Sequence, residues 1–588
     1  MGNFNLNHLY YIFVFLLKTV PLAITFNACL KTDNTTYSNP IISGSYPDPS
    51  ICKVGEDFYL VNSSFEYFPG LPIHHSKDLV NWELVGYGLH REAQCTGKIN
   101  LTNVQSNGGI HAPSIRYHDG FFYIITTNVY SPAVGEPAQM INFIITSENI
   151  EGPWSDPKII DGAPGIDPDI IFDDNKVWYV GTHSPDNPKF NGEGEIWLQE
   201  LNPTNWSLIG KRNFLWRGAL YFGTWAEGPH IYKRNGYYYL LIAEGGTSLN
   251  HGVMVAISSK ITGPYVPNDR NPILTSRHLS NDYWVNSVGH GDLIELDNDR
   301  WYMVILGIRS EIKTFSNMGR ETHLAPVIWE KESFDWQYDS IDTEWSQLSK
   351  KDHFEKLRRV NYEWPVCSPI TGRLEKYYPL PFSNSTQSIK NRFLDDFGNT
   401  KLDLEWNFRR VPNLNTYEMK TEKGFLRLFA SPNIIEERSR CSILGIRQKE
   451  SQFSFTAKML FNPKSDQVQS GISLFQKDDN YITYTIEKTK QNYILKLVVK
   501  EKNSLPITIK KDFLPSYEGS IIFKITSDNK VYKYFFSIDD SKTFHFFAEN
   551  DADVILCKSY TGTYCGLYAT SNGKHVTEYA DYDWVILE

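Results

Sequence analysis

One pattern of hydrophobic and polar residues recurs five times in the first half of the chain. Each copy has a Pro or an Asp near its start, then a short apolar strand, a turn rich in Gly, Asp or Asn, and an aromatic strand. The copies are PDPSICKVGEDFYLV (47–61), HAPSIRYHDGFFYII (111–125), IDPDIIFDDNKVWYV (166–180), EGPHIYKRNGYYYLL (227–241) and HGDLIELDNDRWYMV (290–304). Successive copies begin about 60 residues apart, which indicates a structural repeat.

A fainter second pattern follows most copies. Its forms are SKDLVNW (76–82), SENIEGPW (147–154), SSKITGPY (258–265) and KESFDW (331–336). Each repeat is therefore predicted to hold two hairpins, and five such units predict a five-bladed β-propeller over residues 38–345. The alternative is a large β-sandwich with chance similarity between its strands, which the nearly constant register of five copies disfavours.

The repeat ends after residue 345. Residues 346–390 carry prolines and polar residues without repetition, so we predict a linker. Alternating strands such as GISLFQ, NYITYTIEK, NYILKLVVK and SIIFKITSD then run through residues 391–588. They predict a C-terminal β-sandwich, and hence an all-β protein of two domains.

The register of the repeat places chemistry-bearing residues at one point. The opening strand of each repeat should be the innermost strand of its blade, so the five starts meet at one end of the axis. Three carboxylates and two histidines occupy the first two positions: Asp48, His111, Asp167, Glu227 and His290. Prolines flank Asp48 on both sides, so we expect it in an extended conformation with its side chain in the shared cavity.

Length and charge limit the function classes. The 588 residues exceed what one core supports, and the net charge is −10 without a basic stripe, which excludes a nucleic-acid partner. The apolar run Tyr10 to Phe26, followed by Asn27-Ala28, predicts a secretory signal over residues 1–28 and a secreted protein. Lys18 interrupts this run and argues against a transmembrane anchor.

Cysteines and glycosylation triplets fit an exported chain. The seven cysteines include no CxxC pair, so a zinc site is not expected, and their disulfide pairing stays open. Five N-x-Ser/Thr triplets fit a glycoprotein. They begin at Asn34, Asn62, Asn100, Asn205 and Asn384.

Three converging carboxylates suit glycoside hydrolysis. An inverting glycosidase uses one carboxylic acid to protonate the leaving oxygen and a second carboxylate, roughly 6.5–9.5 Å away, to activate water. Different blades can supply this separation, and a third carboxylate can keep the acid protonated because like charge raises a pKa. Binding of calcium or a transition metal by the same groups is the alternative. Asp169 is expected on the opposite strand face or at a turn.

The sequence resembles glycoside hydrolase family 43, in its β-xylosidase and α-L-arabinofuranosidase branch with a C-terminal β-sandwich. The resemblance covers nearly all of the chain after the signal. It rests on SYPDPS (45–50), SSFEYFPGLPIHHSKDLVNW (63–82), GGIHAPSIRYHDG (108–120), GIDPDIIFDD (165–174), EGPHIYKRNGYYYL (227–240), GHGDLIEL (289–296), MGRETHLAPV (318–327), FLDDFGNTKLDLEWNF (393–408), LGIRQ (444–448) and YTGTYCGLYAT (560–570).

The resemblance implies catalytic roles for the three carboxylates. Asp48 matches the general base that deprotonates the attacking water, and Glu227 matches the general acid. Asp167 matches the carboxylate that tunes the pKa of the acid and orients it.

It also implies roles in sugar binding. Phe65 matches an aromatic residue of the sugar pocket, and Arg320 matches an arginine close to a sugar hydroxyl or the acid. His290 matches an axial histidine, which in some relatives lies beside calcium or water. No cofactor is required, and axial calcium stays open. His111 stands where many relatives have Trp, so a smaller hydrogen-bonding ring replaces a stacking face and leaves the sugar preference open.

The predicted function is that of a secreted inverting exo-glycosidase acting on terminal β-D-xylosyl residues of xylo-oligosaccharides. An α-L-arabinofuranosidase, or a bifunctional enzyme acting on arabinoxylan-derived substrates, is the first alternative. A non-catalytic carbohydrate-binding propeller is the second, although a binder would be free to lose the acids. A fructan-cleaving enzyme is disfavoured because the expected N-D-P-N/D-G opening is absent from SYPDPS.

Overall fold

A computed structural model describes residues 35–297, 299–331, 363–388, 392–420, 422, 424–490, 492–538, 543–556 and 560–588. The predicted signal, residues 1–28, lies outside the described residues, as do Cys29, Asn34 and Cys557. In the part of the chain that is described, no helix is long and apolar enough to cross a membrane.

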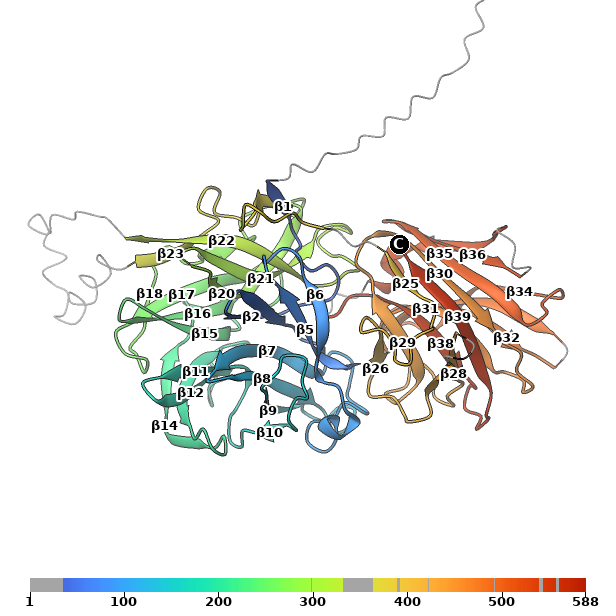
Figure 1. Cartoon of the computed structure of the whole chain (residues 1–588), viewed down its shortest axis with the longest axis horizontal. Coiled ribbons are helices and arrows are strands. Elements are labelled where there is room, and N and C mark those ends of the chain that lie inside the picture. The colour runs from blue at the N-terminus through green and yellow to red at the C-terminus, as the bar shows by residue number, and fades with distance from the viewer. Residues whose placement is uncertain are drawn as a thin grey trace, which may run out of the picture.

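Five antiparallel sheets form the N-terminal domain (Figure 1). The first sheet consists of β2 (Ser50–Val54), β3 (Asp57–Val61), β5 (Gly70–Ser76) and β6 (Glu83–Leu89). The second sheet consists of β7 (Gly109–His118), β8 (Phe121–Tyr130), β9 (Gln139–Ser147) and β10 (Lys158–Ile159). The third is β11 (Ile166–Asp173), β12 (Lys176–His183), β13 (Glu195–Leu201), β14 (Leu208–Trp216). The fourth is β15 (Glu227–Arg234), β16 (Tyr237–Glu244), β17 (Gly252–Ser258), β18 (Val266–Pro267), with β19 (Leu274–Thr275) beside β17. The fifth is β20 (Val285–Glu295), β21 (Trp301–Arg309), β22 (Glu321–Lys331) and β23 (Glu363–Cys367).

The first strands of the five sheets form a closed ring. Strand β2 contacts β7, β7 contacts β11, β11 contacts β15, β15 contacts β20, and β20 returns to β2. This is the five-bladed propeller that the repeat predicts, with each opening strand innermost. At the aromatic position of the second strand, Tyr179 and Tyr239 are buried in hydrophobic clusters that include a neighbouring blade. The other three tyrosines at this position are partly buried.

The predicted linker is partly wrong. Residues 363–367 of the segment 346–390 form β23, which pairs with β22 and completes the fifth blade. Residues 377–379 form β24 (Tyr377–Pro379), which pairs with β1 (Thr36–Ser38) near the start of the described chain. A single outer strand is too short to show a repeat, so only its pairing identifies it.

The C-terminal domain is a β-sandwich, as predicted. One sheet contains β27 (Tyr417–Lys420), β28 (Phe425–Phe429), β39 (Tyr579–Leu587), β30 (Gln452–Leu460), β35 (Ser520–Asp528), β36 (Val531–Ser537) and β37 (His545–Asp551), with β25 (Phe393–Asp395) beside β39. The other contains β34 (Ile507–Phe513), β33 (Tyr493–Lys500), β32 (Asn480–Lys488), β31 (Gln469–Lys477), β38 (Tyr564–Thr570), β29 (Ser442–Arg447), β26 (Asn407–Arg409) and β4 (Tyr67–Phe68). Short 3₁₀ helices are η1 (Glu92–Cys95) and η4 (Ala552–Ile555).

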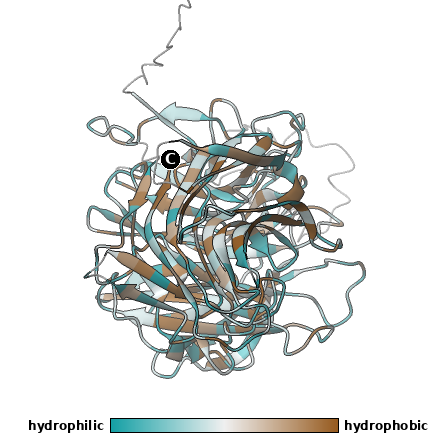
Figure 2. Ribbon diagram, turned by 90° about the vertical axis from the view of Figure 1, so that its right-hand side faces the viewer, coloured by the Kyte–Doolittle hydropathy of each residue, from teal (hydrophilic) through white to brown (hydrophobic). Residues whose placement is uncertain are grey.

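The alternation of side chains builds the core of the sandwich. Along β33, Leu495, Leu497 and Val499 are buried, while Lys496 and Val498 between them are only partly buried. The three buried residues belong to one large hydrophobic cluster, to which strands of both sheets contribute. Figure 2 shows brown and teal residues interspersed along the strands.

The two domains share a sheet. Strand β4 belongs to the loop that follows β3 in the first blade, yet it pairs with β26 of the sandwich, Phe68 opposite Phe408. A second contact joins Thr563, whose backbone N–H donates to the carbonyl of Asn317 at 2.7 Å. The sandwich is therefore attached beside the start of the first blade and beside the residues that precede β22.

Two predictions about covalent chemistry can be compared with the fold. Five cysteines are buried and free: Cys52, Cys95, Cys367, Cys441 and Cys565.

Asn62 is fully buried, and its amide donates to the carbonyls of Tyr46 and Pro47 at 3.0 Å each. Asn62 therefore fixes the backbone before Asp48, and its triplet is inaccessible to glycosylation in the folded protein.

Candidate active site

Irregular strand pairing lies at or beside the candidate residues of blades 2 to 5, at the start of their inner strands, whereas Asp48 lies two residues before β2. Asp48 has φ 52°, Asp167 has φ 54° and His290 has φ 50°, all in the left-handed region. The expectation of an extended Asp48 is therefore wrong. Ladder pairing in the third blade jumps from Ile166 to Asp169, so Asp167 lies inside the irregularity, where it is free to leave the sheet plane.

The carboxylate of Asp48 is held by two donors. Ser63 Oγ donates to Oδ2 at 2.6 Å, and Arg320 Nη1 donates to Oδ1 at 2.8 Å. His290 Nδ1 lies 3.8 Å from Oδ1. Burial opposes ionisation of Asp48, but the Arg320 guanidinium, His290 and the Ser63 hydroxyl outweigh it and leave the pKa below its ordinary 3.8. Asp48 is thus a buried anion at neutral pH.

Asp167 is the opposite case. It is buried, and the backbone N–H of Gly228 donates to its Oδ2 at 3.2 Å. Burial, followed by the negative charge of Asp48, raises the pKa of Asp167 to about 7. The bond from Gly228 also ties Asp167 to the residue that follows Glu227.

The pKa of Glu227 is raised as well. Glu227 is partly buried at the first position of β15. Burial, then the charges of Asp167 and Asp48, raises the pKa of Glu227 well above its ordinary 4.5, and Arg320 only partly opposes this. One pocket therefore holds a carboxylate that favours ionisation and a carboxylic acid that favours its proton, which are the two states that general base and general acid catalysis require.

An aromatic pair encloses Arg320. The guanidinium lies 5.5 Å from the ring centre of Phe65 and 5.2 Å from that of Tyr560, and these two rings are stacked with centroids 5.7 Å apart. Phe65 was predicted to line the pocket, whereas Tyr560 was not. Tyr560 comes from the sandwich, at the start of the YTGTYCG stretch, where its sequence gave no sign of chemistry.

The two predicted histidines are neutral rings. His111 packs edge-on against Phe65 at 4.9 Å, and its Nε2 lies 3.0 Å from the carbonyl of Asn107. Burial lowers the pKa of His111 and of His290 to about 4 each. His290 lies directly against Gly228, where a Cβ would approach its ring to 2.9 Å. Neither histidine carries charge at neutral pH.

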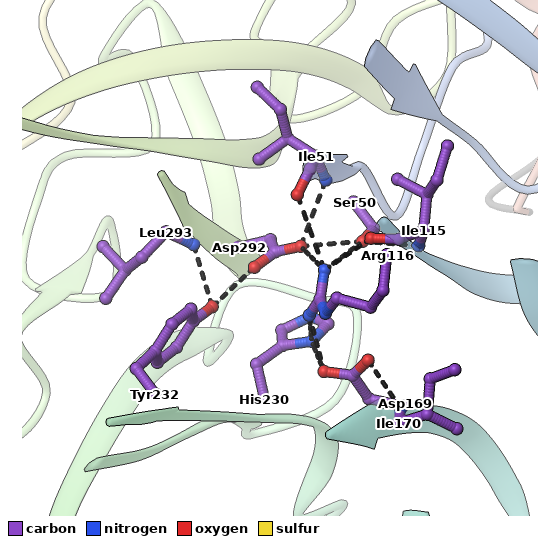
Figure 3. Close-up of polar contacts among 10 residues, drawn as sticks. All are labelled: Ser50, Ile51, Ile115, Arg116, Asp169, Ile170, His230, Tyr232, Asp292 and Leu293. Carbon is purple, nitrogen blue, oxygen red and sulfur yellow. Dashed lines mark hydrogen bonds and ion pairs between the residues drawn. The ribbon is translucent and has the colours of Figure 1, made fainter. Parts of the chain in front are cut away.

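An arginine lies among the inner strands, where residues of all five blades meet (Figure 3). Arg116 Nη1 donates to Asp292 Oδ2 at 2.9 Å and Nη2 donates to Asp169 Oδ2 at 2.5 Å. The same Asp169 oxygen lies 2.8 Å from His230 Nδ1. The expectation for Asp169 is therefore wrong, because this side chain points to the axis and not to a turn or an opposite face.

All five blades contribute to this cluster. Ser50 Oγ and Tyr232 OH donate to the two oxygens of Asp292 at 2.7 and 2.6 Å, and the N–H of Ile115 donates to Ser50 Oγ at 3.1 Å. Ser50 and Asp169 each lie two residues after a candidate carboxylate, Asp48 and Asp167. The cluster therefore fixes the inner strands directly after the pocket residues.

The axial donors do not fit calcium. Asp169 and Asp292 face a guanidinium that already neutralises them. Ser50 and Tyr232 donate to Asp292, and their oxygens already accept the backbone N–H groups of Ile115 and Leu293. His290, the predicted metal neighbour, has Asp48 as its one acidic neighbour within 4 Å in the described structure. Among the described residues, no group of three or more His, Cys, Asp or Glu is arranged to hold a metal ion.

Known proteins resemble the whole chain. Residues 37–334 match the glycosyl hydrolases family 43, and residues 394–588 match the beta xylosidase C-terminal Concanavalin A-like domain. A xylosidase/arabinosidase of Butyrivibrio fibrisolvens is 37% identical over 565 residues, which cover 94% of this chain and 99% of the relative. A non-reducing end alpha-L-arabinofuranosidase of Bacteroides ovatus is 33% identical over 555 residues, 93% of this chain and 94% of the relative. The solved xylan beta-1,4-xylosidase of Bacillus halodurans matches with a TM-score of 0.81 at 27% identity, over 94% of this chain and 100% of that one.

Proposed function

This chain belongs to glycosyl hydrolase family 43, and we propose that it is a secreted inverting exo-glycosidase that releases terminal β-D-xylosyl residues from xylo-oligosaccharides. The observation that carries the proposal is the opposite perturbation of two acids in one pocket: Asp48 favours its anion, and Glu227 favours its proton. Export rests on the predicted signal over residues 1–28.

The proposed reaction is a single displacement. Asp48 takes a proton from water as the water oxygen attacks the anomeric carbon, and the bond from that carbon to the leaving oxygen breaks as Glu227 donates its proton to that oxygen. Both products are neutral, and the released pentose has the inverted anomeric configuration. Asp48 then returns its proton to solvent while Glu227 regains one, which completes the cycle.

Asp167 and Arg320 support this assignment of roles. Burial, followed by the negative charges of Asp167 and Asp48, raises the pKa of Glu227 well above its ordinary value, so Glu227 holds a proton that it can donate near neutral pH. Asp167 has a pKa raised to about 7 by burial and by Asp48. Arg320 keeps Asp48 ionised through the hydrogen bond at 2.8 Å. The same guanidinium, flanked by Phe65 and Tyr560, is available to a sugar hydroxyl.

The shape of the site supports removal of single terminal sugars. The Arg116 cluster occupies the propeller axis next to the candidate carboxylates, and the stacked pair Phe65 and Tyr560 lies beside Arg320 at the sandwich side. Side chains on these two sides suit the end of a sugar chain better than its middle.

The second candidate activity is release of α-L-arabinofuranosyl residues. It is favoured by the arabinofuranosidase of Bacteroides ovatus among the relatives and by His111, whose ring, packed edge-on against Phe65, is smaller than the Trp of many family members. Arabinoxylan-derived oligosaccharides would then be substrates.

Purified protein tests the proposal on nitrophenyl β-D-xylopyranoside and nitrophenyl α-L-arabinofuranoside. Replacement of the general acid (Glu227→Ala) or the general base (Asp48→Ala) should lower kcat at least about 10³-fold on whichever substrate the wild type prefers. The matched control is Asp173→Asn, because Asp173 pairs with Lys233 at the far end of β11, and this variant should retain wild-type rates. Binding of pentosides without turnover by the wild type would instead identify a lectin-like propeller and refute the proposal.

A further inference from the structure

The loop before Glu227 exposes an unusual set of apolar side chains. Residues 217–226, here called the aromatic loop, connect β14 to β15 and end at the candidate acid. Their exposed fractions are 50% for Leu220, 90% for Tyr221, 67% for Phe222 and 43% for Trp225. Contiguous exposed apolar side chains on a soluble domain mark a binding surface, and this one lies at the end of the axis where the candidate carboxylates meet.

Trp225 is held in a fixed and strained position. It has φ 55°, in the left-handed region that bulky residues rarely adopt, and its N–H donates to the carbonyl of Gly192 at 2.7 Å. Its ring lies against two glycines from other loops. A Cβ would approach the ring to 2.9 Å at Gly192 and to 2.7 Å at Gly246, so no larger residue fits at either place. The structure therefore makes room for an indole that remains nearly half exposed.

A buried carboxylate fixes the rest of the aromatic loop. Glu244 is fully buried, and its Oε2 accepts the N–H of Ala219 at 2.6 Å. A Cβ at Gly223 would approach the Glu244 carboxyl carbon to 2.7 Å, so the backbone of the loop lies directly on this side chain. The exposed rings are therefore presented by an anchored loop.

Two chains of contact link Trp225 to the reacting groups. Along the sequence, only Ala226 separates it from Glu227, and the Ala226 carbonyl accepts a hydrogen bond from Thr182 Oγ1 at 2.5 Å. Through space, Thr247 follows Gly246, and its Oγ1 accepts a hydrogen bond from Arg320 Nη1 at 3.3 Å. Arg320 in turn binds Asp48. Trp225 thus lies at the margin of the pocket on the side of Glu227.

We propose that Trp225, extended by Tyr221 and Phe222, is the binding platform for the sugar on the leaving-group side of the scissile bond. This inference rests on the proposed function, in which Glu227 protonates the leaving oxygen, so the sugar that carries this oxygen must lie on the Glu227 side. The occupant is a pyranose of a β-linked xylo-oligosaccharide, whose axial C–H groups present an apolar face to an indole ring. An aromatic side chain with a preset position binds at low entropic cost, which explains the anchored loop.

Two substrates separate this role from catalysis. Xylotriose places sugars on the platform, whereas β-D-xylopyranosyl fluoride reaches the same carboxylates with fluoride as its leaving group. For Trp225→Ala, the ratio of kcat/KM on xylotriose to kcat/KM on the fluoride should fall at least tenfold, mainly through KM. Trp225→Phe should recover part of this ratio. The control is Phe513→Ala, which removes an exposed ring from β34 of the sandwich and should leave the ratio unchanged.

The outcomes are distinct. An equal loss on both substrates, or no change in the ratio, overturns the platform and leaves the proposed function standing. Failure of the wild type to hydrolyse either substrate overturns the proposed function itself. Size-exclusion chromatography adds a further arm: a wild-type dimer that becomes monomeric in Trp225→Ala, with an unchanged ratio, would assign the rings to a subunit interface and overturn the platform.

Discussion

Replacement of Asp167 by asparagine should stabilise the protein in a pH-dependent way. The carboxyl of Asp167 has a pKa of about 7 in the folded chain and an ordinary value of 3.8. Between these values, the unfolded chain has released its proton and the folded chain still holds it. The free energy of unfolding of the wild type therefore falls as pH rises through this window, by up to about 1.4 kcal/mol per pH unit.

The magnitude follows from the two pKa values. From pH 5 to pH 7 the wild type loses about 2 kcal/mol of stability at this one group, and Asp167→Asn does not, because asparagine does not titrate. Asparagine also keeps an oxygen that can accept the N–H of Gly228. In thermal denaturation, the Tm of the variant relative to that of the wild type should rise by roughly 2–3 °C between pH 5 and pH 7.

Asp48→Asn is the matched control with the opposite sign. The folded pKa of Asp48 lies below 3.8, so its stabilising contribution is present throughout pH 5 to 7 and is lost only as pH falls through the folded pKa. The variant leaves Arg320 without its carboxylate and should be less stable than the wild type by a similar amount at both pH values. A stability difference for Asp167→Asn that stays constant or shrinks from pH 5 to pH 7 would refute the account of a protonated Asp167.

Four further outcomes follow. The pH–rate profile of the wild type should be bell-shaped, since activity falls at low pH as Asp48 gains a proton and at high pH as Glu227 loses one. In Asp167→Asn the alkaline limb should move to lower pH. An unmoved alkaline limb would contradict the claim that the charge of Asp167 raises the pKa of Glu227. Arg116→Met should lower the free energy of unfolding by about 3–5 kcal/mol in urea titrations, because two buried carboxylates lose their cation. Incubation of the wild type with EDTA should leave activity unchanged, and loss of activity in EDTA would point to a metal. Tyr560→Ala should raise KM for nitrophenyl pentosides several-fold with a smaller change in kcat, and an unchanged KM would exclude the sandwich from sugar binding. A propeller ending at residue 390 should be insoluble or inactive, since it exposes β4 and lacks Tyr560; full activity of this fragment would show that the sandwich is dispensable.

The repeat made the fold predictable because its signals are local. Each blade contains alternating strands and a turn of Gly, Asp or Asn within about 15 residues, and constant register carries the position of Asp48 over to Asp167 and Glu227. The fourth strand of the last blade was not predictable in this way. Strand β23 lies far along the chain from β22, and nothing in EWPVC indicates which sheet it joins.

The site was predictable only where the repeat reaches. Tyr560 enters the pocket from the other domain, and Trp225 precedes the repeat in a loop, so periodicity says nothing about either side chain. Arg116 lies within the repeat, but its role depends on Asp169 and Asp292 pointing to the same axis. The left-handed conformation of Asp48 was missed because flanking prolines favour an extended backbone, whereas in the structure its side chain is held by Ser63 and Arg320, partners that local sequence does not reveal.

The central claim is that Asp48 activates water and Glu227 donates a proton. ¹H NMR of the first sugar formed from nitrophenyl β-D-xylopyranoside tests this claim most directly. Spectra recorded within the first minutes, before mutarotation, should show α-xylopyranose appearing ahead of the β-anomer. Initial formation of β-xylopyranose would mean retention through a covalent glycosyl-enzyme and would contradict the assignment of these two carboxylates.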